Sequence, residues 1–318
     1  MLQGCYTWKI ILMNHRFFNP LLLFIILISC NNVSDNDLYD LNDEVITFPR
    51  EFNISHNSLN RKYIFYKPKN LAENSPLVFV LHGYTSNSSN IMNYSKMNSI
   101  ADENGFAVCY PQGTNNSLTG ASHWNANLKP MSSVEDSSFL TELAKHLQDE
   151  YDLSTENTFA CGMSNGGFMS YTLACERSET FKAIASITGT MSGYDWQNCN
   201  PNHKIPVLQI SGTNDRTVPM DGSMSPTWGW GGAPDIENII DYWSEINECS
   251  NSKIINLPDI SSQDNSFVTL DKRFNLESKD RVRLYTVHGG GHDWPGAWGN
   301  MDIDASEEIW DFFSKHLK

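Results

Sequence analysis

The chain has 318 residues, of which 40% are hydrophobic and 12% aromatic, enough to bury the core of one large α/β domain or two small ones. Its 37 acidic residues outnumber its 22 basic ones and give a net charge of −15. This balance argues against nucleic acid or an anionic membrane surface as a partner, because no basic patch is evident that would neutralise phosphates. It is typical of a protein that acts on an uncharged substrate.

The N-terminal region has the features of an export signal. An apolar run over 21–30 follows His15 and Arg16. It is too short to span a bilayer, but it has the length of the hydrophobic region of a secretory signal. The run ends in Leu27-Ile28-Ser29-Cys30, which resembles the lipobox of bacterial lipoproteins, where the cysteine is lipidated and becomes the first mature residue.

These features divide the chain into three parts. We expect a lipoprotein-type signal peptide over 1–30, a flexible acidic tether over 31–44 and a single domain over 45–318. Met13 is an alternative start, because Met13 to Cys30 is already a complete short signal. A plain signal peptide or a buried helix are the alternatives to lipidation. The prediction is an exported protein, anchored to a membrane only through lipid on Cys30, or secreted.

Apolar strand-like runs alternate with amphipathic helical patterns after residue 45, which indicates a mostly parallel sheet covered by helices on both faces. One pattern predicts a single helix from about 91 to 104. Ser132 and Ser133, three residues before Glu135 and Asp136, predict a capping box at the start of the next helix. The strands are expected at 46–54, 62–66, 77–81, 106–110, 159–161, 183–188, 205–210 and 281–287.

The sequence Gly162-Met163-Ser164-Asn165-Gly166 has the spacing of a nucleophile elbow. It lies between an apolar strand and an apolar helix, and glycines two residues either side of the serine relieve the clashes of a sharp turn. An ordinary glycine and serine turn is the alternative. Ser164 is therefore the candidate nucleophile, provided that the chain supplies a base and an acid.

His292 and Asp215 are the candidate base and acid. Both follow predicted strands, and ligand sites of open α/β sheets lie outside the carboxyl ends of the strands. His288 competes with His292 but ends its strand, and Asp215 could instead be a simple turn residue. The order Ser164, Asp215, His292 is that of the α/β-hydrolase triad.

Two backbone N–H groups are expected to form the oxyanion hole. One belongs to Asn165, which follows the nucleophile, and the other to Tyr84 in the loop after the strand 77–81. His82 is expected to support that loop rather than to take part in catalysis.

Four motifs, LHGYTSN, CGMSNGG, SGTNDRTVP and GGGHDWPG, resemble those of the poly(3-hydroxybutyrate) depolymerase-like esterases. These are close to the feruloyl and acetylxylan esterases of carbohydrate esterase family one. The resemblance runs from about Tyr63 to Gly296 and implies an α/β-hydrolase fold. It implies Ser164 as nucleophile, Asp215 as acid and His292 as base.

The loops near the predicted strand ends are rich in tryptophan. Trp124, Trp228, Trp230 and Trp294 are expected to bind a phenolic acyl group, a sugar ring or a hydrophobic polyester. Core or lid packing is the alternative for each of them.

Five cysteines remain after the signal, and an exported protein can form disulfides. Cys109 and Cys161 lie in apolar strands and are expected in the core. Cys199 and Cys249 lie in polar surroundings and are the preferred disulfide pair. No spacing of cysteine and histidine suggests a metal site.

The sequence thus predicts an exported serine carboxylesterase, monomeric and without cofactor, which hydrolyses feruloyl or acetyl esters on plant polysaccharide. The alternatives are a depolymerase of hydroxyalkanoate oligomers, a serine peptidase on the same fold, and a non-catalytic surface lipoprotein that binds glycan.

Overall fold

The computed structural model describes residues 48–117, 119–128, 132–224 and 231–318. Contacts divide the chain into Met1–Ile46 and Thr47–Lys318, and the described residues belong to the second unit. The predicted signal, the tether and Cys30 lie outside them. Among the described residues, no helix is both long enough and apolar enough to cross a membrane.

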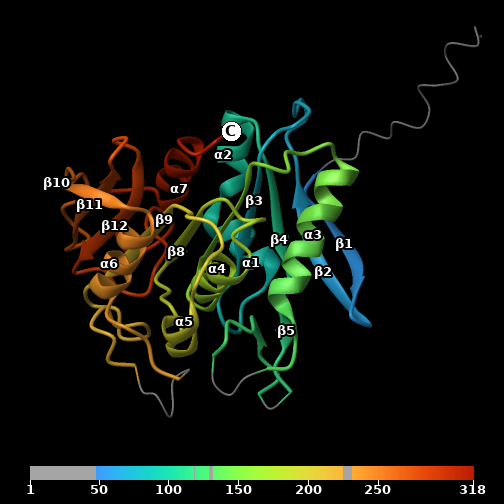
Figure 1. Cartoon of the computed structure of the whole chain (residues 1–318), viewed down its shortest axis with the longest axis horizontal. Coiled ribbons are helices and arrows are strands. Elements are labelled where there is room, and N and C mark those ends of the chain that lie inside the picture. Colours follow the sequence, from blue (N-terminus) through green and yellow to red (C-terminus); the bar gives the residue numbers. More distant parts are fainter. Residues whose placement is uncertain (1–47, 118, 129–131, 225–230) are drawn as a thin grey trace, which may run out of the picture. The chain divides into compact units, whose positions relative to one another are not determined.

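Ten strands form one sheet in the order β1-β2-β4-β3-β7-β8-β9-β12-β11-β10 (Figure 1). The six strands from β4 to β12 are parallel, and antiparallel strands flank them at both edges. A separate two-stranded sheet pairs β5 with β6. The strands are β1 Arg50–His56, β2 Leu59–Tyr66, β3 Leu77–Leu81, β4 Ala107–Pro111, β5 Thr114–Asn115, β6 Ser122–His123, β7 Thr158–Met163, β8 Ile184–Ile187, β9 Val207–Gly212, β10 Cys249–Asn256, β11 Phe267–Asn275 and β12 Asp280–His288.

Helices cover both faces of the large sheet. One hydrophobic cluster joins the sheet to α3, α4 and α6, and a second joins its other face to α1, α2 and α7. The helices are α1 Ser88–Ser95, α2 Met97–Asn104, α3 Asp136–Glu150, α4 Asn165–Glu176, α5 Gly193–Asn198, α6 Ile236–Ile246 and α7 Ala305–Ser314. The predicted layers are therefore present in the described part of the chain.

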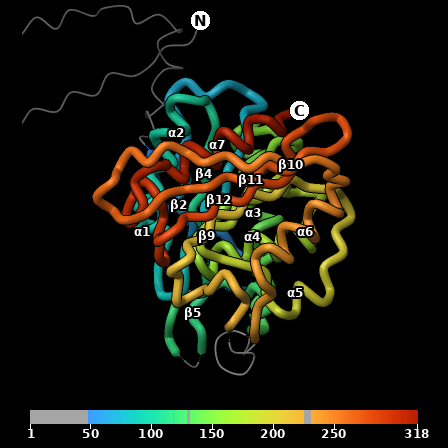
Figure 2. Tube along the Cα trace, turned by 90° about the vertical axis from the view of Figure 1, so that its left-hand side faces the viewer, coloured from blue at the N-terminus to red at the C-terminus, as the bar shows by residue number. Residues whose placement is uncertain are grey.

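Burial explains which strands could be foreseen. All five residues of β3 are buried, as its continuous apolar run predicts for a central strand. By contrast, β10 is mostly exposed and lies at the edge of the sheet beside β11 and β12 (Figure 2). Neither β10 nor β11 was predicted, because partly exposed strands such as the edge strand β10 and its neighbour β11 carry a weak apolar pattern.

Two predicted helix features differ from the structure. The helix expected over 91–104 is two helices, because Lys96 adopts a left-handed φ of 52° between α1 and α2. The capping box is absent: Glu135 caps α3 without a side-chain bond, and the Ser132 hydroxyl accepts from the N–H of Val134 instead.

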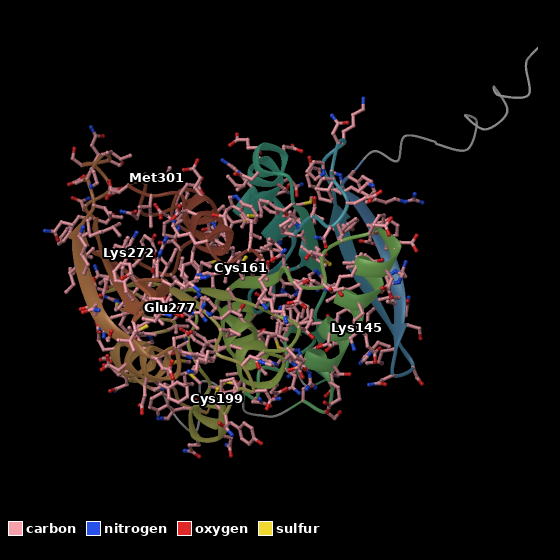
Figure 3. The ribbon with its side chains drawn as sticks, turned by 45° about the horizontal axis from the view of Figure 1, so that its top comes forward. Lys145, Cys161, Cys199, Lys272, Glu277 and Met301 are labelled. Carbon is pink, nitrogen blue, oxygen red and sulfur yellow. A yellow bond between two sulfur atoms is a disulfide. The ribbon has the colours of Figure 1, made fainter. Side chains whose placement is uncertain are left out.

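The predicted Cys199–Cys249 disulfide is wrong. Cys175 at the C-terminus of α4 bonds to Cys199, with Cα atoms 5.0 Å apart, and Cys249 is free and half-buried. The short helix α5, which was not predicted, brings Cys199 to the end of α4 (Figure 3). Cys109 and Cys161 are free and buried, as expected.

Candidate active site

Ser164 forms the tight turn between β7 and α4. Its φ of 55° and ψ of −120° lie outside the regions that non-glycine residues usually adopt. A Cβ on Gly162 would lie 2.5 Å from the backbone of Gly166, and a Cβ on Gly166 would lie 2.2 Å from the carbonyl oxygen of Leu81. Only glycine fits at these positions, and the geometry matches that of a nucleophile elbow.

Asp215 and His292 meet at the same edge of the sheet, in the loops after β9 and β12. His292 Nδ1 and Asp215 Oδ2 are 2.7 Å apart, and the Asp215 side chain is buried. The other carboxylate oxygen, Oδ1, accepts from the N–H groups of Thr217 at 2.8 Å and Val218 at 2.9 Å. An ionised carboxylate only accepts, so His292 Nδ1 donates and Nε2 is left to accept a proton.

A cavity of about 510 Å³ adjoins both Ser164 and His292. The serine and the histidine both line this cavity, although they are far apart in the sequence. The remaining lining residues come from β7, from the loop after β3 and from α1: Met163, Gly83, Tyr84, Ser86, Asn90, Ile91, Asn93 and Tyr94. Its volume is in the range of pockets that hold whole small molecules.

The loop after β3 lies directly against the nucleophile. A Cβ on Gly83 would be 3.4 Å from the Cβ of Ser164, and Tyr84 lines the cavity. Asn165 is the first residue of α4, where backbone N–H groups lack partners within the helix. The two expected oxyanion donors therefore belong to segments that border Ser164.

His82 supports this loop, as expected from the sequence. Its ring is buried, Nε2 accepts from the N–H of Gly113 at 3.0 Å, and Nδ1 lies 2.8 Å from the carbonyl oxygen of Gly83. Burial lowers the pKa of His82 to about 4, although the hydrogen bond to Gly83 opposes this shift. The ring is therefore neutral at pH 7, which matches one accepting and one donating nitrogen.

Trp124 and Trp294 do not form the substrate platform that we expected. Both indoles are buried, and each N–H finds a partner inside the protein. Trp124 donates to the carbonyl of His82, and Trp294 donates to the hydroxyl of Ser306. Trp124 instead holds Asn165, the residue after the candidate nucleophile. Its backbone N–H donates to the side-chain oxygen of Asn165, and its carbonyl accepts from the side-chain NH₂. Trp228 and Trp230 lie outside the described residues.

The wall formed by α1 was missed from the sequence. Asn90, Ile91, Asn93 and Tyr94 line the cavity from one side of this helix. The sequence contains a pattern that could have indicated this wall, because asparagines are interspersed with apolar residues in the stretch Asn90 to Tyr94, soon after β3. The prediction of one long helix obscured it, since α1 ends at Ser95.

Among the described residues, no group of three or more histidine, cysteine or acidic side chains is arranged to hold a metal ion. The site holds the groups of a hydroxyl, imidazole and carboxylate series: the imidazole of His292 is bonded to the carboxylate, and it lines one cavity together with the hydroxyl of Ser164. Such a series activates a serine for attack on a carbonyl carbon.

Comparisons with known proteins agree with this chemistry. The family model described as "Esterase PHB depolymerase" matches residues 61–203. A protein of Aspergillus oryzae named "Probable feruloyl esterase C" is 30% identical over 83% of this chain and 88% of its own. The "Bifunctional acetylxylan esterase/xylanase XynS20E" of Neocallimastix patriciarum is 27% identical over 79% of this chain, which spans only 32% of that protein.

Among solved structures, the "Acetyl xylan esterase from Aspergillus awamori" is similar with a TM-score of 0.59 at 15% identity. The match covers 84% of this chain and 99% of that one. At this identity the likeness concerns the fold alone, and the fold is that of the α/β-hydrolases.

Proposed function

Because the chain belongs to the PHB depolymerase-like esterases and is similar to feruloyl esterase C over most of its length, it is a carboxylic ester hydrolase, and we propose that it cleaves feruloyl or acetyl esters through an acyl-enzyme. The observation that carries the proposal is that Ser164 and His292 line one cavity while Asp215 bonds His292 from behind it. The polysaccharide-borne substrate is supported by the names of the relatives.

In the proposed mechanism, the Ser164 hydroxyl attacks the ester carbonyl while His292 Nε2 accepts its proton. The negative charge on the carbonyl oxygen is stabilised by the N–H groups of Asn165 and Tyr84. His292 then donates the proton to the leaving alkoxide, which leaves the acyl group on Ser164. A water molecule, deprotonated by His292, releases the acid and restores the serine.

The size and lining of the cavity favour a feruloyl over an acetyl group. An acetyl group would fill only a small part of about 510 Å³. A feruloyl group has an apolar ring with a polar far end, and the cavity offers both Ile91 and the amides of Asn90 and Asn93. Oligomers of 3-hydroxybutyrate are the second candidate, favoured by the description of the family model.

We further propose that the protein is exported and anchored through lipid on Cys30, which rests on the apolar run and the lipobox-like sequence. Metabolic labelling with a palmitate analogue tests this directly. A wild-type chain that takes up the label while Cys30→Ala does not would support the anchor, and equal labelling would contradict it.

The esterase proposal is tested by comparing kcat/KM for methyl ferulate, acetylated xylan and hydroxybutyrate oligomers. Ser164→Ala should abolish hydrolysis of all three and labelling by a fluorophosphonate probe. Ser86→Ala is the matched control, because Ser86 lines the same cavity without a role in the proposed chemistry. An unchanged rate in Ser164→Ala would refute the mechanism.

A further inference from the structure

A second and larger cavity, of about 890 Å³, is lined by basic side chains. The local charge is opposite to that of the chain: six of the 22 lysine and arginine residues line it, but only Glu156 of the 37 acidic ones. The expectation from the net charge, that the chain carries no basic patch, is therefore wrong for this cavity. The six residues are Lys182, Lys204, Lys279, Arg281, Lys315 and Lys318.

This basic cavity lies at the amino ends of the parallel strands, whereas Ser164 lies at their carboxyl ends. Glu156 precedes β7, while Ser164 follows it, and Lys182 and Lys204 precede β8 and β9. A six-residue strand such as β7 is about 20 Å long. Figure 1 likewise marks the C-terminal end at the top, away from α5 and β5 at the carboxyl ends of the strands. The cavity is therefore separate from the proposed catalytic centre.

Arg281 supplies a guanidinium whose contacts in the cavity are neutral. Its Nε donates to the side-chain oxygen of Asn247 at 3.1 Å, and one terminal nitrogen donates to the carbonyl of Lys204 at 2.9 Å. Burial lowers the pKa of Arg281, yet a guanidinium keeps its charge in proteins. A half-buried cation bonded to neutral acceptors favours an anion beside it.

His316 presents an unpaired nitrogen at the same cavity. Its Nε2 is buried and has no hydrogen-bond partner among the described residues, while the ring also bonds the backbone of Asp280. Burial, followed by the charges of Arg281, Arg283 and Lys315, lowers the pKa of His316 to about 3. At pH 7 the His316 ring is therefore neutral, and the positive charge of the cavity comes from its lysines and Arg281.

The lysines are paired only at the exposed rim. Lys279 pairs with Glu277 at 2.7 Å and Lys318 with Glu156 at 3.0 Å, and all four side chains are more than half exposed. Lys204 pairs in the same way with Glu248, whereas Lys315 is 40% exposed and pairs with Asp311, which also bonds the buried Arg283. Such exposed pairs are weak and their long side chains are free to turn, so the ammonium groups remain available to a ligand.

We propose that the basic cavity binds a phosphate group, carried either by a small soluble molecule or by the headgroup of an anionic phospholipid. Phosphate oxygens accept several charge-assisted hydrogen bonds at once, which suits a cavity lined by several lysines and a guanidinium. The volume exceeds that of a bare phosphate, so the group is carried on a larger molecule.

The test is a ³¹P NMR titration of the full chain at fixed ionic strength. The probes are inorganic phosphate, glycerol 3-phosphate and dihexanoylphosphatidylglycerol below its micelle concentration, with dihexanoylphosphatidylcholine as the zwitterionic reference. Saturable binding of the phosphates alone identifies a soluble ligand, and binding of the phosphatidylglycerol identifies a lipid headgroup. No saturable binding of any anionic probe would overturn the proposal.

Lys279→Gln and Lys315→Gln should each weaken binding about fivefold, the effect of one unit charge about 4 Å from the anion in water. Lys145→Gln is the matched control, because Lys145 is exposed on α3, outside the cavity lining (Figure 3). Hydrolysis of p-nitrophenyl acetate should be unchanged in all three variants, which separates this site from the esterase. An equal loss of binding in Lys145→Gln would assign the effect to net charge and refute the site.

Discussion

Replacing Asp215 by asparagine should reverse the tautomer of His292 without disturbing the fold. The side-chain oxygen of the asparagine must face the N–H groups of Thr217 and Val218, which now donate to Oδ1. The amide NH₂ is then directed at His292 Nδ1, which lies 2.7 Å from the present Oδ2. Two donors cannot share this contact, so the imidazole proton moves to Nε2 and the base can no longer accept from Ser164.

The expected result is a fall in kcat of about 10⁴, or about 5.5 kcal/mol of transition-state stabilisation. KM should change little, because Asp215 does not line the cavity. The assay is steady-state hydrolysis of methyl ferulate and p-nitrophenyl acetate, with the thermal midpoint measured in parallel to verify that the variant is folded.

Asp293→Asn is the matched control, because this carboxyl group is next to His292 in sequence and is also partly buried. Burial raises its pKa, and the charge of His292 opposes that effect. The control should keep kcat within a few-fold of the wild type. If Asp293→Asn were the inactive variant and Asp215→Asn kept more than a tenth of kcat, Asp293 rather than Asp215 would be the acid.

Three further substitutions test the structure around the site. Gly166→Ala should prevent folding or destabilise by about 3 kcal/mol or more, because its Cβ would lie 2.2 Å from the Leu81 carbonyl oxygen; a wild-type urea midpoint would contradict this. Cys175→Ser should lower the free energy of unfolding by about 3.5 kcal/mol, since the disulfide to Cys199 closes a loop with a sequence separation of 24; equal stability under oxidising conditions would exclude the pairing. Burial raises the pKa of Asp195 to about 6, against hydrogen bonds that lower it, so the folded state binds the proton more tightly than the unfolded state. Stability should therefore fall by about 3 kcal/mol as the pH rises from about 4 to 6, and urea titrations of Asp195→Asn should lack that fall.

The position of the three proposed catalytic residues could be predicted because it depends on topology. Parallel strands end at one edge of the sheet, so residues that follow β7, β9 and β12 must lie near one another. They can meet because these strands are close in the sheet, where only β8 separates β7 from β9 and β12 adjoins β9. The glycine spacing around Ser164 added to this prediction. The structure shows the reason for the glycines, because a Cβ at Gly162 would clash with Gly166 and a Cβ at Gly166 would clash with Leu81.

Residues on loops and at helix breaks could not be placed in this way. Trp124 and Trp294 are long side chains on irregular segments, and the sequence does not say whether an indole points into the cavity or into the core. The disulfide failed for a related reason. Cys199 directly follows the six-residue helix α5, and so short a helix leaves little pattern to detect.

Reaction class and substrate choice are therefore carried by different parts of the protein. In the proposed mechanism, the serine, histidine and carboxylate act on any ester whose carbonyl reaches them, so they would not distinguish one acyl group from another. Asn90, Ile91, Asn93 and Tyr94 are spaced so that they lie on one side of α1 and face the cavity as a unit. Because Lys96 ends α1 with a left-handed turn, this wall is set by backbone conformation as well as by side chains. Changes in α1 should alter KM and selectivity among esters while leaving the acylation chemistry intact.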